Sequence, residues 1–409
     1  MSLRREIGVF GATMMGLGSV VGTGVFVSIG IAAGLAGAGV VIAIVLSGLL
    51  AIGNALSSAQ LAANHPVSGG TYEYGYHYLK AWLGFSAGWM FLCVKTASAA
   101  TAALGFSGYL LNATGQDAGW LVPLAVATVI VLTILVLFGI RLSNQVNMVI
   151  VSITLLALLG FVAAGAPAVS LSRLQPAIVP SSILHATALM FVAFTGYARI
   201  ATLGEEVIQP RRTIPRAIVA TLVASMLLYV AVAVVGVGAA GADALSAATT
   251  EKAAPLEVVS RGFPWRVHWL VAVGAMTAML GVLLNLLLGL SRVLLAMGRR
   301  GDMPTATAKL GVAVVVTGTA ILALAATGSV KTTWSFSAFT VLVYYAITNL
   351  AAIALPKTQR LYRPWIARTG LVACLFLAFW VDWKVWCAGS GLLLLGLLWH
   401  GLARRLSPT

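Results

Sequence analysis

The sequence predicts an all-α polytopic membrane protein, and three observations lead to that class. Hydrophobic residues make up 60% of the 409 positions and charged residues only 9%, whereas roughly a quarter of the residues in soluble domains are charged. The mean hydropathy is +1.00. The apolar residues also gather into stretches of about 20, the length that a helix needs to cross a bilayer. Lipid is therefore the solvent for most of this chain, and little sequence is left for a separate soluble domain.

About twelve such stretches follow one another along the chain, joined by short polar loops. They are expected at 8–32, 38–63, 82–111, 119–139, 147–166, 183–208, 216–240, 267–297, 311–327, 333–355, 367–381 and 384–402. An even number of spans places the two termini on the same side of the membrane. The first span begins close to Met1 and is longer than a signal-peptide core, so we expect it to be retained.

The basic residues indicate the orientation of these spans. A net charge of +15 would suggest a nucleic-acid partner in a soluble protein. In this chain most lysines and arginines fall in the loops on the side of the termini, for example Arg211, Arg212, Arg299 and Arg300. Because basic loops stay in the cytoplasm, we expect both termini to be cytoplasmic and no nucleic-acid partner. The compact loops are typical of a protein of the prokaryotic inner (plasma) membrane.

Several classes of chemistry lack a signature in this sequence. The three cysteines, Cys93, Cys374 and Cys387, lie in or beside apolar stretches without metal-ligand spacing, so neither a disulfide framework nor a zinc site is expected. There is no glycine-rich phosphate loop that ends in Gly-Lys-Ser/Thr, and the five histidines are scattered near predicted span ends. We therefore expect no cofactor, no metal and no enzymatic activity, and a gradient as the energy source.

Two glycine-containing segments are predicted to interrupt membrane helices. In the first span Gly22 and Gly24 flank Thr23, and missing Cβ atoms make departure from helical geometry less costly. In the sixth span the run Phe-Thr-Gly-Tyr at 194–197 is a second candidate break. Each lies about a dozen residues into its span, a correspondence that an inverted repeat of five plus five helices would produce. Either segment alone could instead serve close helix packing.

A helix break inside the membrane predicts a binding site. Its unpaired N–H and C=O groups are tolerated only where protein, water or ligand satisfies them. The N–H groups that begin a half-helix suit a carboxylate, and freed carbonyl groups suit an ammonium group or a cation. A zwitterionic amino acid matches both. No polar face or carboxylate ring repeats over several spans, so a channel is less well supported than a carrier.

Four motifs stand in one order along the chain. They are Gly-Ser-Val-Val-Gly-Thr-Gly-Val-Phe at 18–26, Ser-Gly-Gly-Thr-Tyr-Glu-Tyr at 68–74, the segment at 191–218 with its Glu-Glu, Pro-Arg-Arg and Ile-Pro-Arg-Ala-Ile elements, and Ser-Arg to Arg-Gly-Asp-Met-Pro at 291–304. Together they resemble the amino acid–polyamine–organocation (APC) superfamily of amino acid permeases over nearly the whole chain.

This resemblance implies a LeuT-like inverted-repeat core with broken helices 1 and 6, followed by two extra C-terminal helices. The first repeat would occupy 1–166, the second 167–356 and the extra helices 357–409. Transport would proceed by alternating access around a central amino acid site.

The resemblance also assigns residues to that site. The backbone at Val21, Gly22, Thr23 and Gly24 would hold the main-chain carboxylate and amine of the substrate. A second set would complete the amine site and shape the side-chain pocket, namely Ala193, Phe194, Thr195, Gly196 and Tyr197.

Glu205 and Glu206 would lie at a cytoplasmic gate. The alternative for both glutamates is an ordinary ion-pair network with Arg211, Arg212 or Arg216.

Three further positions are candidates for charge or coupling roles. Lys95 and Arg199 fall within spans, where charged side chains are costly and often functional, although a long basic side chain can also extend to the interface. Proton-linked members of the family often carry a lysine in the fifth helix, and this chain has Thr154 there. The Thr154 hydroxyl could help to bind sodium, Lys95 could supply the missing charge, or Thr154 could simply pack between helices. The coupling ion, H⁺ or Na⁺, and the oligomeric state stay open at this point.

The predicted function is secondary active transport of an L-amino acid across the plasma membrane. A neutral side chain is favoured because the sequence places no carboxylate in the pocket, and an acidic substrate becomes plausible if Lys95 or Arg199 faces it. The alternatives are an exporter or exchanger of amino acids, a carrier of polyamines or other organic amines, and, in a different class, an amino acid-sensing receptor.

Overall fold

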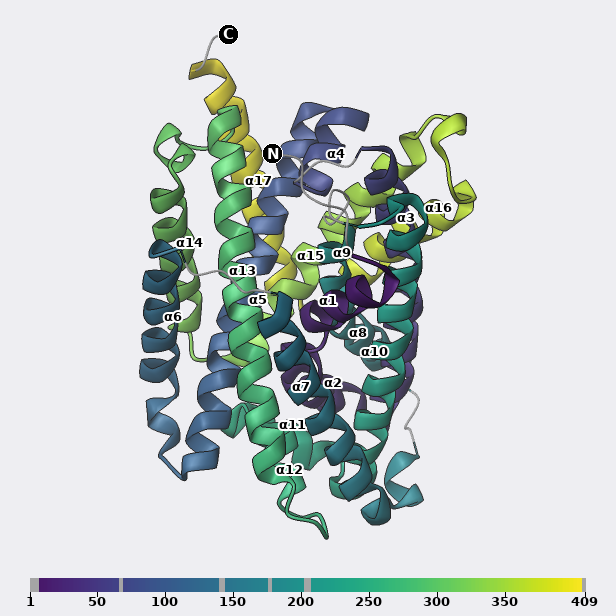
Figure 1. Cartoon of the computed structure of the whole chain (residues 1–409), viewed down its shortest axis with the longest axis vertical. Coiled ribbons are helices and arrows are strands. Elements are labelled where there is room, and N and C mark those ends of the chain that lie inside the picture. Colours follow the sequence, from purple (N-terminus) through teal and green to yellow (C-terminus); the bar gives the residue numbers. More distant parts are fainter. Residues whose placement is uncertain (1–6, 66–68, 140–143, 176–178, 202–206, 407–409) are drawn as a thin grey trace.

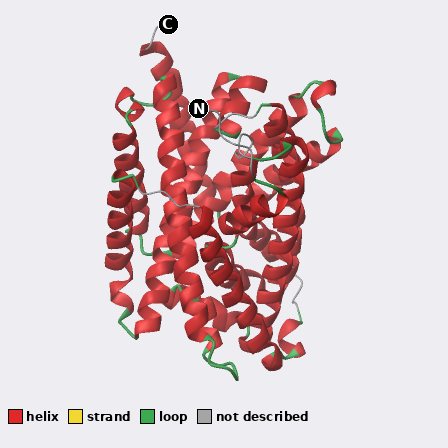
Figure 2. Ribbon diagram, in the orientation of Figure 1, coloured by secondary structure: helices red, strands yellow, loops and turns green. Residues whose placement is uncertain are grey.

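The computed structural model of the chain describes residues 7–65, 69–139, 144–175, 179–201 and 207–406. In these ranges the regular structure is helical (Figure 2), and one isolated parallel β-bridge joins Ile7 to Val207. The predicted all-α class is confirmed.

The long helices follow the order of the predicted spans (Figure 1). They are α1 (Val9–Val20), α2 (Ile29–Ala36), α3 (Val40–Asn64), α5 (Ala81–Thr114), α6 (Leu121–Leu137), α7 (Asn144–Gly165), α8 (Pro180–Phe194), α9 (Ala198–Ala201), α10 (Pro210–Ala240), α13 (His268–Arg300), α14 (Leu310–Ala325), α15 (Val330–Ala354), α16 (Pro364–Ala378) and α17 (Trp383–Leu406). Shorter helices are α4 (Thr71–Tyr78), α11 (Ala242–Lys252) and α12 (Pro255–Ser260). A π-helical segment, η1 (Gly24–Ser28), precedes α2, and a 3₁₀ turn, η6 (Thr195–Tyr197), follows α8.

Nine of the described helical stretches are long and apolar enough to cross a membrane. One of them, Gly24–Asn64, contains the second half of the first span and the whole of the second. Three shorter apolar helices, Val9–Val20, Leu310–Ala325 and Pro364–Ala378, complete the series. A polytopic membrane protein is therefore confirmed, and each predicted span corresponds to one helix or to two half-helices.

The sequence analysis missed helices in two of the predicted loops. The loop at 64–81 contains α4, and the loop at 240–268 contains α11 and α12. Hydropathy identifies membrane spans by length and apolar content, and these polar segments satisfy neither criterion. Figure 1 shows α4 and the C-terminal end of α17 at one end of the molecule, and α11 and α12 at the other. We call these the α4 end and the α11–α12 end.

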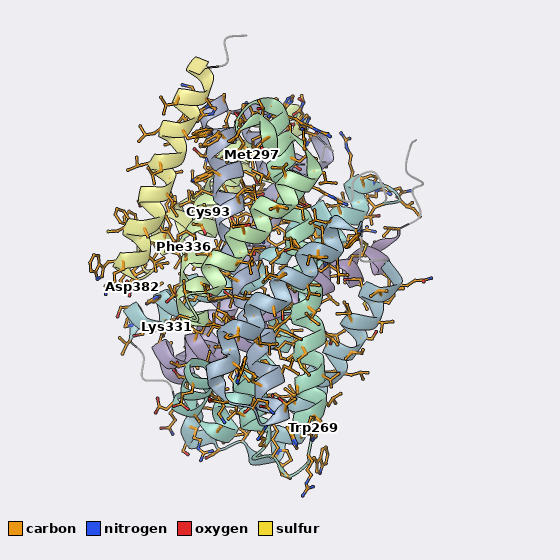
Figure 3. The ribbon with its side chains drawn as sticks, turned by 90° about the vertical axis from the view of Figure 1, so that its left-hand side faces the viewer. Cys93, Trp269, Met297, Lys331, Phe336 and Asp382 are labelled. Carbon is orange, nitrogen blue, oxygen red and sulfur yellow. The ribbon has the colours of Figure 1, made fainter. Side chains whose placement is uncertain are left out.

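Burial separates a central group of helices from a peripheral one. In α15, 78% of the most apolar 18-residue segment is buried inside the protein. In the spans formed by α6 and by α17, the buried share of the corresponding segment is 17%. Large apolar side chains such as Leu394, Leu395 and Leu398 are exposed on α17, as expected where lipid covers them. Figure 3 shows α13 running the length of the bundle, with Trp269 near one end and Met297 near the other.

The concentration of arginine at the α4 end generates a prediction of orientation. In a background without the exposed Cys387, we introduce Lys80→Cys beside α4 or Glu251→Cys on α11, both at exposed positions. A membrane-impermeant maleimide added to intact cells is expected to label position 251 and not position 80, because basic loops stay in the cytoplasm. Labelling of position 80 and not of position 251 would contradict the predicted orientation and indicate the opposite one.

Candidate functional site

The first membrane helix is broken where the glycine pattern predicts it. Helix α1 ends at Val20, and Val21 has extended geometry with ψ 101° before the chain becomes π-helical at Gly24. A Cβ on Gly24 would lie 2.5 Å from the Cβ of Ala193, and one on Gly22 would lie 2.6 Å from a methyl group of Val282. Glycine is thus required here because neighbouring segments approach too closely for a side chain.

The sixth membrane helix is also broken at its predicted position. Helix α8 ends at Phe194, and the 3₁₀ turn η6 leads into the short helix α9. A Cβ on Gly196 would overlap the carbonyl oxygen of Ser19. The two broken helices therefore touch backbone to backbone, although nearly 180 residues separate them along the chain.

Tyrosine hydroxyl groups from other helices bind the carbonyl oxygens exposed by the breaks. The Tyr229 hydroxyl on α10 donates to the carbonyl oxygen of Val20 at 2.7 Å and lies 3.4 Å from that of Ala193. The Tyr345 hydroxyl on α15 lies 3.4 Å from the carbonyl oxygen of Thr195. These residues were not identified from the sequence. The chain has ten tyrosines, and no local pattern marks the ones that reach a distant backbone.

A cavity of about 410 Å³ extends from the breaks toward the α4 end. Its walls come from α1, α3, α5, α13, α15, the second break and the chain around the start of α4. Of the predicted substrate-binding residues, Thr195 and Gly196 line it. The others lie behind this wall and are buried, namely Val21, Gly22, Thr23, Gly24, Ala193, Phe194 and Tyr197. Ser58, Asn285 and Arg292 also line the cavity and were not predicted as site residues.

The cavity wall is basic. Lys95, Arg199 and Arg292 line it, and none of its described lining residues is acidic. The ammonium group of Lys95 donates to the hydroxyl of Thr195 at 3.4 Å, directly at the second break. Both arginine side chains are exposed, so the cavity reaches solvent on their side. The structure thus brings both predicted intramembrane cations to the same space.

Two hydroxyl groups are relevant to ion coupling. Thr154 is buried, and its hydroxyl donates to the carbonyl oxygen of Ile150 at 2.7 Å, within its own helix. The Thr23 hydroxyl at the first break is buried and has no hydrogen-bond partner among the described residues. Glu205 and Glu206, the predicted gate residues, lie outside the described residues.

The α11–α12 end is closed over the first break. The Tyr109 hydroxyl donates to the carbonyl oxygen of Phe26 at 2.8 Å and accepts from the backbone N–H of Leu256 at 3.3 Å. Phe26 and Leu256 are fully buried. This bond chain fastens α12 to η1, so the cavity has access to solvent at the α4 end and is sealed at the other.

An aromatic and charged cluster holds α4 beside the cavity. The Asp302 carboxylate accepts from the hydroxyls of Tyr72 at 2.6 Å and Tyr76 at 2.8 Å. Arg300 pairs with Glu73 at 2.8 Å. Burial and the neighbouring Asp302 carboxylate raise the pKa of Tyr72, so its hydroxyl stays a donor at physiological pH. These contacts join the motifs at 68–74 and 291–304 in space.

Comparison with known proteins agrees with this geometry. The model of the family described as "Amino acid permease" matches residues 11–408. An uncharacterised transporter of Mycobacterium tuberculosis is 39% identical over 415 residues, covering 98% of this chain and 92% of the relative. In Bacillus subtilis, a branched-chain amino acid permease is 31% identical over 330 residues and a methylthioribose transporter 30% identical over 329 residues, each alignment covering 76% of this chain and 70% of the relative.

The contact between the breaks generates a prediction for Gly196. Gly196→Ala is expected to lower the thermal unfolding midpoint in detergent, because overpacking costs about 1–3 kcal/mol and the obstructing atom belongs to the backbone of Ser19. Gly53→Ala is the matched control, since a Cβ there meets nothing within 4 Å. Equal midpoints for the two variants would contradict the close contact.

A second prediction concerns the Tyr229 hydroxyl. Tyr229→Phe leaves the carbonyl oxygen of Val20 without its donor, which we expect to destabilise the protein by about 1–3 kcal/mol. Tyr362→Phe serves as control, because this partly exposed tyrosine lies away from both breaks. Thermal unfolding of both variants in the same detergent measures the difference, and an unchanged midpoint for Tyr229→Phe would show that the bond does not stabilise the fold.

Proposed function

This chain belongs to the amino acid permease family, and on that premise we propose that it is a secondary active transporter that moves an L-amino acid by alternating access. The observation that carries the proposal is the backbone contact of two broken helices beside one cavity. Paired broken helices at the centre of a membrane protein are typical of secondary transporters with inverted repeats. We propose the repeats at 1–166 and 167–356, with 357–409 outside them.

The proposed substrate site lies where the cavity meets the breaks. Residues 21–24 would bind the main-chain groups of the amino acid, and residues 193–197 would complete the amine site and the side-chain pocket. Thr195 and Gly196 already line the cavity, and the unpartnered hydroxyl of Thr23 is available to a ligand. Several of these positions are buried, so binding by the first break requires a local rearrangement that widens the cavity inward.

The proposed conformation is open to the cytoplasm. The cavity reaches solvent at the α4 end, which the basic residues assign to the cytoplasm, while Tyr109 and Leu256 close the opposite end. Alternating access would require the contact between α12 and η1 to open as the α4 end closes. The proposed location is the plasma membrane, the inner membrane of a prokaryote, with both termini cytoplasmic.

We propose that the side chain of the substrate is either uncharged or negatively charged. The sequence favours a neutral one, and the cavity adds a reason to exclude cations, because three basic side chains line it and its described lining residues contain no carboxylate. A polyamine carrier is less well supported for the same reason. Import, export and exchange would use the same site, as would a sensing receptor. Flux of a labelled amino acid, net or by exchange, distinguishes a carrier from a receptor.

The coupling ion is proposed to be H⁺ or Na⁺. Thr23 is a candidate oxygen for Na⁺, because its buried hydroxyl lies at the first break and has no hydrogen-bond partner among the described residues. Thr154 is a second candidate, since its hydroxyl donates within its helix and keeps its oxygen lone pairs free. In the absence of sodium dependence, Lys95 is the candidate for proton coupling.

Ligand-dependent thermal stability tests the proposed function. Purified protein is heated with each of the twenty amino acids, with and without sodium, at two pH values. A ligand present at 100 times its Kd raises stability by about 2.7 kcal/mol, so we expect a raised midpoint for a small set of amino acids and none for lysine or putrescine. Reconstituted vesicles should then show saturable, competable flux of the same amino acids. Stabilisation by polyamines alone would favour the alternative carrier.

A further inference from the structure

Lys95 is a half-buried cation whose one hydrogen bond among the described residues is to a neutral group. It lies 14 residues into α5, about 21 Å from the start of that helix at 1.5 Å per residue. Its ammonium group donates to the hydroxyl of Thr195 at 3.4 Å. The ion pairs formed among the described side chains join other residues, with Glu73, Glu257 and Asp302 as the acids. No described carboxylate therefore neutralises Lys95.

This position requires a physical explanation. A lysine side chain is too short to reach the interface from that depth, and its nitrogen is held at the second break instead. Partial burial of an ammonium group without a counter-ion is costly, and charged residues inside the membrane usually pair with one another or with backbone carbonyl groups and mark substrate pathways. The cavity is the space that Lys95 faces, so an anion that enters the cavity can serve as its partner.

The rest of the cavity favours the same kind of ligand. Arg199 and Arg292 also line the cavity, and its other polar lining groups, such as Ser58 and Asn285, are uncharged. An amino acid with a neutral side chain has no net charge, and if its own carboxylate binds the first break, Lys95 stays unpaired. A second carboxylate, on the side chain of the substrate, would lie toward the second break, where the ammonium group of Lys95 is located.

We propose that the preferred substrate is an acidic L-amino acid whose side-chain carboxylate binds the ammonium group of Lys95. This inference rests on the proposed function and names its substrate class. Lys95 then determines specificity, and the arginines attract the anion from the α4 end by long-range electrostatics. Amides of the same shape fit the space but leave Lys95 without a counter-ion.

Matched acids and amides test the inference. Equilibrium binding of L-glutamate, L-glutamine, L-aspartate and L-asparagine to the purified full-length protein is measured by isothermal titration calorimetry. We expect the acids to bind at least about tenfold more tightly than the amides, a difference of about 1.4 kcal/mol. In Lys95→Gln the ratio should fall to about one, and in Lys95→Arg a preference for the acids should persist. Lys80→Gln, at the exposed start of the same helix, is the control and should keep the wild-type ratio.

The outcomes separate this inference from the proposed function. Wild-type protein that binds the amides or aliphatic amino acids as tightly as the acids overturns the acidic-substrate inference and leaves amino acid transport intact. An unchanged acid-to-amide ratio in Lys95→Gln overturns the role of Lys95. Absence of binding and of flux for every amino acid contradicts the proposed function itself. The comparison within wild-type protein does not depend on whether any variant folds.

Discussion

The requirement that every backbone polar group inside a membrane find a partner governs this structure. Lipid supplies no hydrogen bonds, so a helix can break in mid-membrane only where other groups take over. Here the two breaks lie against each other, and the hydroxyls of Tyr229 and Tyr109 bind the carbonyl oxygens of Val20 and Phe26. The glycines at the contact follow from the same requirement, because Gly196 and Gly24 allow the two backbones to meet.

The tyrosine contacts also link the breaks to elements that could move. Tyr109 joins η1 to α12 at one end of the molecule. At the other end, Tyr72 and Tyr76 hold α4 against Asp302, beside the cavity. Each end is thus fastened by hydrogen bonds as well as by apolar packing, in which Leu256 of α12 and Tyr74 of α4 are buried. The hydrogen bonds are discrete, so the alternating access that we propose could exchange them as a unit.

Positive charge distinguishes the cavity wall from the breaks. The N–H and C=O groups at the breaks suit a carboxylate and an amine, so they match a zwitterion without further charge. Lys95, Arg199 and Arg292 add positive charge that the breaks do not need for a zwitterion. The named relatives range from a branched-chain amino acid permease to a methylthioribose transporter, so membership of the family does not by itself define the substrate. Lys95 donates a hydrogen bond to Thr195 at the second break.

The sequence by itself determined the membrane class, the order of the spans and the positions of both breaks, because hydropathy and missing side chains act locally along the chain. It also singled out Lys95 and Arg199, since charge is conspicuous in apolar stretches. Only the tertiary structure decided that the breaks touch, that Tyr229 and Tyr345 reach them, that α12 closes one end and that Arg292 joins the cavity. Those facts depend on contacts between residues far apart in the chain, where the partner of a buried polar group is chosen by packing and leaves no mark in the local pattern.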